Sequence, residues 1–265
     1  MMNKYYHYYH LVTYSPWPLL TALNMLLNLL IMIKLMNYKS VSLLNWLMFM
    51  TLILCLIQWN YSIIYESLYQ GYHTKKVQLN LSYGMILFIL SEVMFFFSFF
   101  WMYFHLFLSP SMEIGNIWPP KNIIPFNPFD IPLLNTVILL TSGITITMSH
   151  FFMLNNNYFL ALNYNLTTIL LAIYFTQLQH EEYNASFFTI NDSSYGSSFY
   201  LLTGFHGLHV IIGAILLTIS MIRMYQYHYS TNHHLLFEFS SWYWHFVDVV
   251  WLFLYIFIYW WNYIN

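Results

Sequence analysis

Long apolar runs separated by short polar stretches dominate the chain. Seven of the runs are long enough to cross a bilayer, because a hydrocarbon core of about 30 Å needs roughly 20 helical residues. They lie at about residues 16–33, 41–65, 79–108, 131–154, 158–178, 197–222 and 235–263. Backbone polar groups in lipid must be paired within their segment, and the runs lack the alternating polarity of barrel strands. The pattern predicts seven transmembrane helices in an all-α fold.

The polar stretches between the runs are too short to form a second domain. The longest covers residues 109–130 and contains five prolines, which indicates an extended surface loop. Neither internal repeats nor low-complexity linkers interrupt the pattern. We therefore expect a single seven-helix transmembrane domain over residues 1–265, with helices 1 and 2 at about 16–65 and helices 3 to 7 at about 79–263.

Composition agrees with a membrane protein. Hydrophobic residues make up 60% of the 265 positions and charged residues 6%, against about 25% charged in an ordinary soluble domain. A single cysteine, Cys55, excludes a disulfide framework or a thiolate metal cluster built from this chain alone. The 25 Tyr and 24 Phe beside one Arg fit an AT-rich coding sequence, which is typical of an organellar gene.

An odd number of spans places the two ends of the chain on opposite sides of the membrane. If the N-terminal end lies on the side of synthesis, the seven-span pattern divides the basic residues unevenly. That side carries Lys4, Lys75, Lys76 and Arg223, and the other carries Lys34, Lys39 and Lys121. Basic residues favour the side of synthesis, so the charge bias supports this orientation weakly.

Glu92 is an ionisable carboxyl in the middle of the apolar stretch SYGMILFILSEVMFFFSFFWMYFH. A charged carboxylate at this depth costs at least a few kcal/mol, so we expect Glu92 to be protonated or paired on a helix face turned toward protein. One interpretation is a proton relay or a ligand-linked carboxyl. The other is a neutral acid that forms a hydrogen bond with another helix, and spacing alone does not separate them.

Two further polar pairs lie within apolar runs. His206 and His209 are three positions apart in GFHGLHVIIG, and His245 and Asp248 are three apart in WYWHFVDVVW, so each pair shares one helix face. Imidazoles on facing helices can ligate haem or copper. They can also form hydrogen bonds between closely packed helices. Without a cysteine cluster or an HExxH motif, the sequence favours the second interpretation.

Cationic and imidazole side chains gather in two of the polar stretches, which the seven-span pattern places on the same side. They are His73, Lys75, Lys76, Arg223, His228, His233 and His234. A cationic cluster at a membrane surface attracts anionic lipid headgroups, by on the order of 1 kcal/mol for each Lys or Arg. Ordinary interfacial anchoring, together with Trp and Tyr, explains the same residues equally well.

A set of motifs in a fixed order carries a resemblance to a known family. The motifs are HLVTYSPWPL, QGYHT, YGMILFILSEVMFF, WPP, PLLNT, SGITIT, YGSSFYLLTGFHGLHVIIG and WYWHFVDVVWLFLY. The similarity covers nearly the whole chain, and the ordered set of motifs is more specific than any one of them. The chain resembles cytochrome c oxidase subunit III in its mitochondrially encoded form.

The resemblance implies an architecture and an assembly. In this family the first two of seven helices are splayed from a bundle of five, and the cleft between them holds phospholipids. It implies a non-redox core subunit of the terminal respiratory oxidase, which passes electrons from cytochrome c to oxygen and pumps protons. Haems and coppers are expected in partner subunits I and II, and none in this chain. Small accessory subunits are further expected partners, and nucleic acid is not.

The resemblance also implies roles for residues and a location. The family's carbodiimide-reactive carboxyl corresponds to Glu92, and we expect no catalytic residue and no metal site. The intramembrane His206, His209, His245 and Asp248 become structural polar groups. The lipid-headgroup contacts correspond to Trp59, Glu66, His73, Arg223 and His228. The protein is expected in the mitochondrial inner membrane, with its N-terminus on the matrix side and its C-terminus on the intermembrane side.

The chain departs from the family pattern near the expected lipid site. Tyr61 and Tyr65 lie in the stretch where the family commonly has Arg, and Ser82 replaces an Arg or Lys before YGM. Headgroup binding is therefore expected to depend more on Lys75 and Lys76.

Two other departures lie nearer the C-terminal end. The family's usual His-His pair, after the polar stretch of the fourth helix, is His150-Phe151 here, and the usual terminal Trp-Trp-Gly is Trp260-Trp261-Asn262.

Two rival functions belong to other classes of protein. The first is a stand-alone proton or solute transporter that uses Glu92 as its titrating site, which inverted repeats or paired broken helices would favour. The sequence has neither feature. The second is a haem-carrying membrane cytochrome, which would show a Soret band in the purified chain.

Overall fold

The chain is almost entirely helical in the computed structural model, which describes residues 9–38 and 43–264. The described part contains long helices α1 (Trp17–Tyr38), α2 (Leu43–Leu68), α3 (Lys75–Leu108), α4 (Ile131–Leu154), α5 (Tyr158–Asn184), α6 (Ser194–Tyr225) and α7 (Leu235–Leu254). A 3-10 turn η1 (Met112–Ile114) lies in the loop after α3, and a π-helical segment η2 (Tyr255–Trp260) and α8 (Trp261–Ile264) continue α7.

Seven helical segments in the described residues are long and apolar enough to cross a membrane. No β-strand occurs in residues 9–38 or 43–264. The prediction of an all-α, multi-pass membrane protein is therefore confirmed. Lys4 and Lys39, which contributed to the charge bias, lie outside the described residues.

The chain divides into two compact units, residues 1–81 and 82–265. In the first unit, polar side chains join α1 to α2. The Asn24 amide donates to Cys55 Sγ at 3.4 Å and accepts from Thr51 Oγ1 at 3.0 Å, and Asn28 donates to the Met48 carbonyl at 3.2 Å. Helices in lipid associate through such bonds because burial of apolar surface gives no advantage there. Most other side chains of the two helices are exposed.

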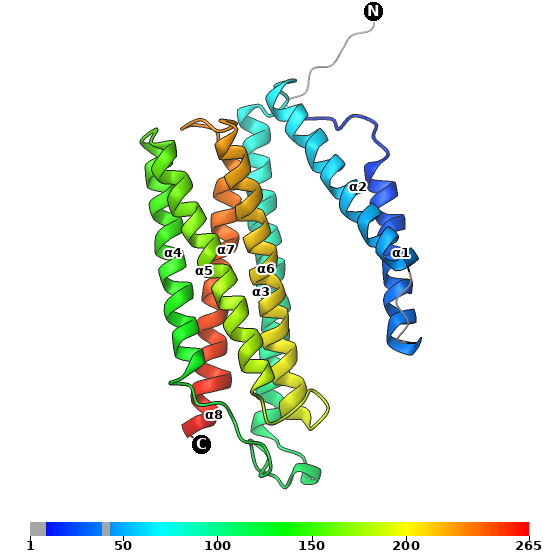
Figure 1. The fold of residues 1–265 in the computed structure, drawn as a ribbon, viewed down its shortest axis with the longest axis vertical. Helices are drawn as coiled ribbons and strands as arrows, with labels where there is room; N and C mark the ends of the chain where they lie inside the picture. The colour runs from blue at the N-terminus through cyan, green and yellow to red at the C-terminus, as the bar shows by residue number, and fades with distance from the viewer. Residues whose placement is uncertain (1–8, 39–42, 265) are drawn as a thin grey trace, which may run out of the picture. The chain divides into compact units, whose positions relative to one another are not determined.

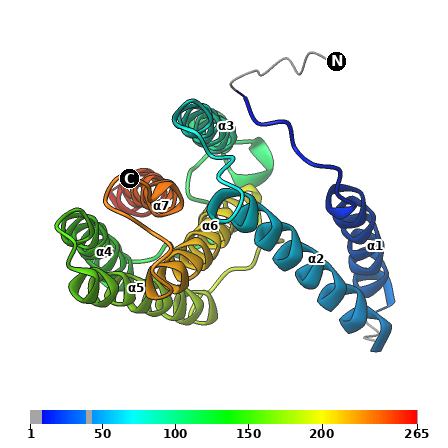
Figure 2. The same cartoon turned by 90° about the horizontal axis from the view of Figure 1, so that it is seen from above.

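In the second unit, α7 lies within a bundle formed by α4, α5, α6 and the larger part of α3 (Figure 2). Trp244 on α7 is fully buried, and its indole N–H donates to Ser142 Oγ on α4 at 2.9 Å. On α6, a Cβ atom at Gly213 would lie 2.9 Å from Trp244 Cε3. The absence of a side chain at Gly213 therefore allows α6 and α7 to approach closely.

Helix α3 contacts its neighbours through long aromatic side chains and runs alongside α6 and α7 (Figure 1). Phe95 meets Phe205 of α6 edge-on with ring centroids 5.1 Å apart, and Phe104 meets Phe257 of η2 at 5.0 Å. Edge-to-face aromatic pairs contribute about 0.5–1.5 kcal/mol beyond the area they bury. Large rings therefore fill the space between these helices.

A buried polar junction joins three segments at one end of this unit. Asn262 of α8 accepts hydrogen bonds at Oδ1 from the Tyr103 hydroxyl of α3 at 2.8 Å and from the Trp118 indole N–H of the proline-rich loop at 3.2 Å. Its own amide donates to the Ile258 carbonyl. Asn262 therefore connects the loop and α3 to the last helical turn.

Several helix ends differ from prediction: α1 ends five residues later, α3 begins four residues earlier, and α5 and α6 are also longer than predicted. Helix α5 continues six residues past the predicted end at Leu178, and the continuation turns Gln179 and Glu182 into the bundle. Helix α6 begins at Ser194 because the Ser193 hydroxyl accepts hydrogen bonds from the first backbone N–H groups. By contrast, the predicted bounds of the fourth span, residues 131–154, agree with α4.

Candidate functional site

Glu92 is paired with a histidine on another helix. Its Oε2 lies 2.9 Å from Nε2 of His209 on α6. The other ring nitrogen of His209, Nδ1, lies 2.6 Å from the Phe205 carbonyl oxygen, which only accepts, so Nδ1 carries a proton. One more proton lies between the carboxyl and Nε2. The pair is electrically neutral whichever atom holds that proton, which explains how lipid depth tolerates it.

Aromatic rings surround this Glu92–His209 pair. The His209 ring lies 4.9 Å from that of Phe96 and stacks at 13° on Tyr243 of α7, with centroids 6.3 Å apart. The Phe95 ring lies 6.1 Å from the His209 ring, between centroids. The His209 side chain is 10% exposed and that of Glu92 is 22% exposed. The shared proton is therefore largely screened from water, and it connects α3 to α6.

His206 lies one turn before His209 but has a different environment. Its ring is 5.2 Å from that of Trp251 on α7 and 5.6 Å from that of Phe175 on α5, and the residue is 1% exposed. Neither ring nitrogen has a hydrogen-bond partner among the described residues. The two histidines share a helix, yet they do not form one site.

His245 and Asp248 lie on one face of α7, as their spacing predicts. Nδ1 of His245 is 4.0 Å from Oδ2 of Asp248, which is too long for a hydrogen bond. Asp248 is buried against α4, where a Cβ atom at Gly143 would come within 2.9 Å of Oδ2, and the His245 side chain is 43% exposed. Asp248 therefore depends on a glycine in the neighbouring helix for its space.

The expected lipid contacts of the first unit lie in the C-terminal part of α2 and at the start of α3. Glu66 accepts hydrogen bonds from Thr13 at 3.0 Å and lies 3.3 Å from Nε2 of His10, so its carboxylate holds the segment before α1 against α2. Trp59 and His73 are half-buried. Lys75 and Lys76 begin α3 and are exposed. Glu66 is thus engaged within the protein, whereas the two lysines lie at a surface.

The expected lipid contacts of the second unit surround the end of α6. The Arg223 guanidinium lies 5.0 Å above the Tyr229 ring, a cation–π contact. Nε of Arg223 has no hydrogen-bond partner among the described residues. Burial, and then the neighbouring Arg223 charge, lowers the pKa of both His228 and His233 below the ordinary value. Arg223 is therefore the main positive charge of this group at neutral pH.

The structure also corrects the placement of Glu182. The sequence pattern ended the fifth span at Leu178 and left Glu182 in a polar stretch, but the residue is 1% exposed within α5. Gln179 Nε2 lies 3.5 Å from Glu182 Oε2. Gln179 and Glu182 are three positions apart, and this spacing indicated that both lie on one face of a continuing helix. The surrounding run of polar residues read instead as a loop, so the sequence pattern ended the helix too early.

Comparison with known proteins covers nearly the whole chain. Residues 7–263 match the model of the family described as cytochrome c oxidase subunit III. The chain is 51% identical over 261 residues to cytochrome c oxidase subunit 3 of Canis lupus, covering 98% of this chain and all of that one. It is 52% identical over 256 residues to the protein of the same name from Drosophila melanogaster, covering 97% of each.

Proposed function

The chain belongs to the cytochrome c oxidase subunit III family and is thus a subunit of the terminal oxidase, and from that premise we propose that it is a non-redox core subunit. In this role it supports the assembly, stability and lipid retention of a complex that passes electrons from cytochrome c to oxygen and pumps protons. The haems and coppers then belong to subunits I and II, with accessory subunits outside. The mitochondrial inner membrane, with the N-terminus on the matrix side, is the proposed location.

The Glu92–His209 pair is the observation that carries the structural role. Both ring nitrogens of His209 are engaged, one with the Phe205 carbonyl at 2.6 Å and one with Glu92 at 2.9 Å. A haem or copper ligand needs a free ring nitrogen directed at the metal. His209 instead uses its nitrogens to join α3 to α6, as expected for a group that stabilises the subunit.

His206 supports the same role in a different way. Its ring is enclosed by Trp251 and Phe175 at centroid distances of 5.2 and 5.6 Å. A porphyrin bound at His206 would have to replace these two rings, which are themselves fully buried. Close packing of this kind is costly to disrupt, so the position favours a role in packing.

The exposed apolar surface supports assembly with other chains and lipid. On α1 and α2, large apolar side chains such as Leu29, Met36 and Trp46 are more than half exposed. Such surfaces are stable only in contact with lipid or with other transmembrane helices. Arg223, with Nε unpaired in the described chain, supports retention of a phospholipid phosphate at the end of α6.

Replacement of His209 tests the non-redox role in the intact oxidase. His209→Phe removes both hydrogen bonds, and we expect this subunit to dissociate more readily in detergent while the haem absorbance per complex stays unchanged. His180→Ala, at an exposed position on α5, is the matched control and should alter neither property. Loss of haem absorbance in proportion to His209 replacement would show that the chain holds a redox centre, contrary to the proposal.

A further inference from the structure

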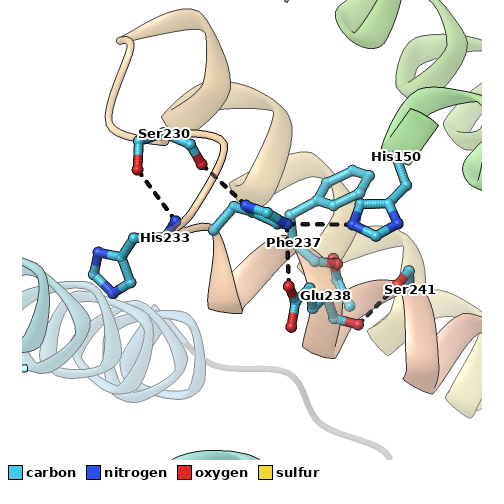
Figure 3. Close-up of polar contacts among 8 residues, drawn as sticks. His150, Ser230, His233, Phe237, Glu238 and Ser241 are labelled. Atoms are coloured by element: carbon cyan, nitrogen blue, oxygen red, sulfur yellow. Dashed lines mark hydrogen bonds and ion pairs between the residues drawn. The ribbon is translucent and has the colours of Figure 1, made fainter. Parts of the chain in front are cut away.

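Three potential metal ligands from two helices converge at the end of the bundle where α4 ends and α7 begins. They are His150 in the last turns of α4, His234 at the start of α7, and Glu238 one turn further along α7. Figure 3 shows His150 and Glu238 directed toward the same point, whereas His233 points away from it. This group is here named the α4–α7 cluster; the sequence analysis counted His234 among the cationic side chains at the membrane surface but connected it with neither His150 nor Glu238.

The distances within the cluster fit a small metal ion. Nε2 of His234 lies 3.2 Å from Nε2 of His150 and 3.0 Å from Oε1 of Glu238. One ligand atom from each of the three residues lies within 4.8 Å of the others. Tetrahedral zinc, with bonds of about 2.0–2.2 Å, holds neighbouring ligand atoms roughly 3.3 Å apart. The two separations from His234 are close to this value, and the cluster needs only a small side-chain movement to bring His150 and Glu238 equally close.

The tautomer of His234 also favours a cation at this point. Its Nδ1 lies 3.0 Å from the carbonyl oxygen of Ser230, which only accepts, so Nδ1 carries the proton. In the neutral ring, Nε2 is then a lone pair that faces the Glu238 carboxylate. Two acceptors 3.0 Å apart repel each other unless a cation lies between them. Zinc-bound histidines have this same arrangement, with the second nitrogen donating to a backbone carbonyl.

A proton is the alternative cation, but it explains only one of the two close contacts of His234 Nε2. A proton on Nε2 of His234 forms a single directed bond, so it serves either Glu238 or His150 but not both. His150 would then approach His234 with no bond to explain the 3.2 Å separation of their nitrogens. A metal ion accepts lone pairs from all three residues at once. The convergence of three ligands therefore favours a metal over a proton.

Access and the remaining coordination position also suit a metal ion. The Glu238 side chain is 30% exposed and that of His234 is 4% exposed, so the cluster has one open side and one closed side. His150 is half-buried and lies against the ring of Phe237, with centroids 5.7 Å apart. Three protein ligands with one open side leave a fourth position for water.

We propose that the α4–α7 cluster is a zinc site, with Nε2 of His150, Nε2 of His234 and a carboxylate oxygen of Glu238 as ligands. Two imidazoles and one carboxylate form a ligand set that zinc accepts readily. Binding joins the end of α4 to the start of α7. This inference differs from the expectation of no metal in the chain, and it does not depend on the function proposed above.

Zinc binding to the intact oxidase complex tests the proposal. The complex is treated with chelator, equilibrated with radioactive Zn2+, and compared with complexes that carry His150→Ala, His234→Ala or Glu238→Gln in this chain. We expect the first two variants to bind one equivalent less, or about 100-fold more weakly, and Glu238→Gln to bind at least tenfold more weakly. His233→Ala, next to the cluster but directed away from it, is the control and should bind as the unaltered complex does.

A measurement on the unaltered complex keeps the test independent of whether the variants assemble. Diethyl pyrocarbonate modifies unprotonated imidazoles that carry a free ring nitrogen, so bound zinc should protect His150 from modification and leave His233 unprotected, as read by mass spectrometry of the peptides. Equal modification of His150 with and without zinc would overturn the proposal. So would a zinc affinity shared by all variants, or a dissociation constant above about 1 mM, which corresponds to only about 4 kcal/mol of binding and indicates adventitious binding.

Discussion

Replacement of Glu92 by Gln should leave the oxygen turnover and proton pumping of the oxidase largely unchanged. The Gln amide N–H can donate to Nε2 of His209, which is the acceptor when Nδ1 donates to the Phe205 carbonyl. The bond between α3 and α6 is then retained at a cost below about 1 kcal/mol, the net contribution of one hydrogen bond. We expect oxygen turnover, proton pumping and subunit retention close to those of the unaltered complex.

Replacement of Glu92 by Ala provides the contrast. It leaves Nε2 of His209 without a partner where the side chain is only 10% exposed, and an unsatisfied buried polar group costs about 1–3 kcal/mol. That cost weakens the α3–α6 contact roughly 5- to 150-fold. We expect Glu92→Ala to lower the retention of this subunit in detergent and the thermal stability of the complex, whereas Glu92→Gln does not.

Proton pumping in reconstituted vesicles decides between a structural pair and a proton carrier. Each variant complex is assayed for oxygen consumption and for protons ejected per electron, with subunit content measured in the same sample. If Glu92→Gln abolishes pumping while oxygen turnover stays near normal, the carboxyl carries pumped protons and the structural reasoning is wrong. If Gln and Ala variants lose the subunit equally, the hydrogen bond to His209 does not stabilise the contact.

Three further predictions concern other residues. A hydrophobic carbodiimide should modify Glu92 in preference to the exposed Glu181, and equal modification of the two would contradict a proton shared in an apolar setting. Arg223→Ala should lower the phospholipid retained per complex without altering the haem spectrum, and unchanged lipid content would remove Arg223 from the lipid site. Gly143→Ala should lower the thermal stability of the complex by about 1–3 kcal/mol, because its Cβ atom would lie 2.9 Å from an oxygen of Asp248; a stability equal to the unaltered complex would refute this.

The hydrophobic pattern predicted the seven spans because length and apolar content decide whether a helix can cross lipid. The bounds of α4 agreed because polar residues flank that run on both sides. The end of α5 was placed six residues too early, since Gln179, His180, Glu181 and Glu182 read as a surface stretch. Two of these four turn inward, and only the packing of neighbouring helices determines which polar residues a helix end buries.

The sequence indicated which types of residue belong to the candidate sites, but it did not indicate which residues they contact. The cost of a charge in lipid indicated that Glu92 needed a partner, yet His209 is 117 positions away in sequence. His150 and His234 are 84 positions apart, and no local pattern connects them. Pairings of this kind follow from the order in which helices surround one another. The splayed arrangement of the first two helices stays a prediction from the family resemblance.

The separation of Glu92 from His209 along the chain has a consequence during protein synthesis. At roughly 5–20 residues per second, the ribosome adds the intervening 117 residues in on the order of 6–25 seconds. Throughout that interval Glu92 has been made while its histidine partner has not, and α3 itself is complete once Leu108 is added. The nascent helix must therefore enter the membrane with its carboxyl neutralised by a proton from solvent, or remain beside the insertion machinery until α6 emerges.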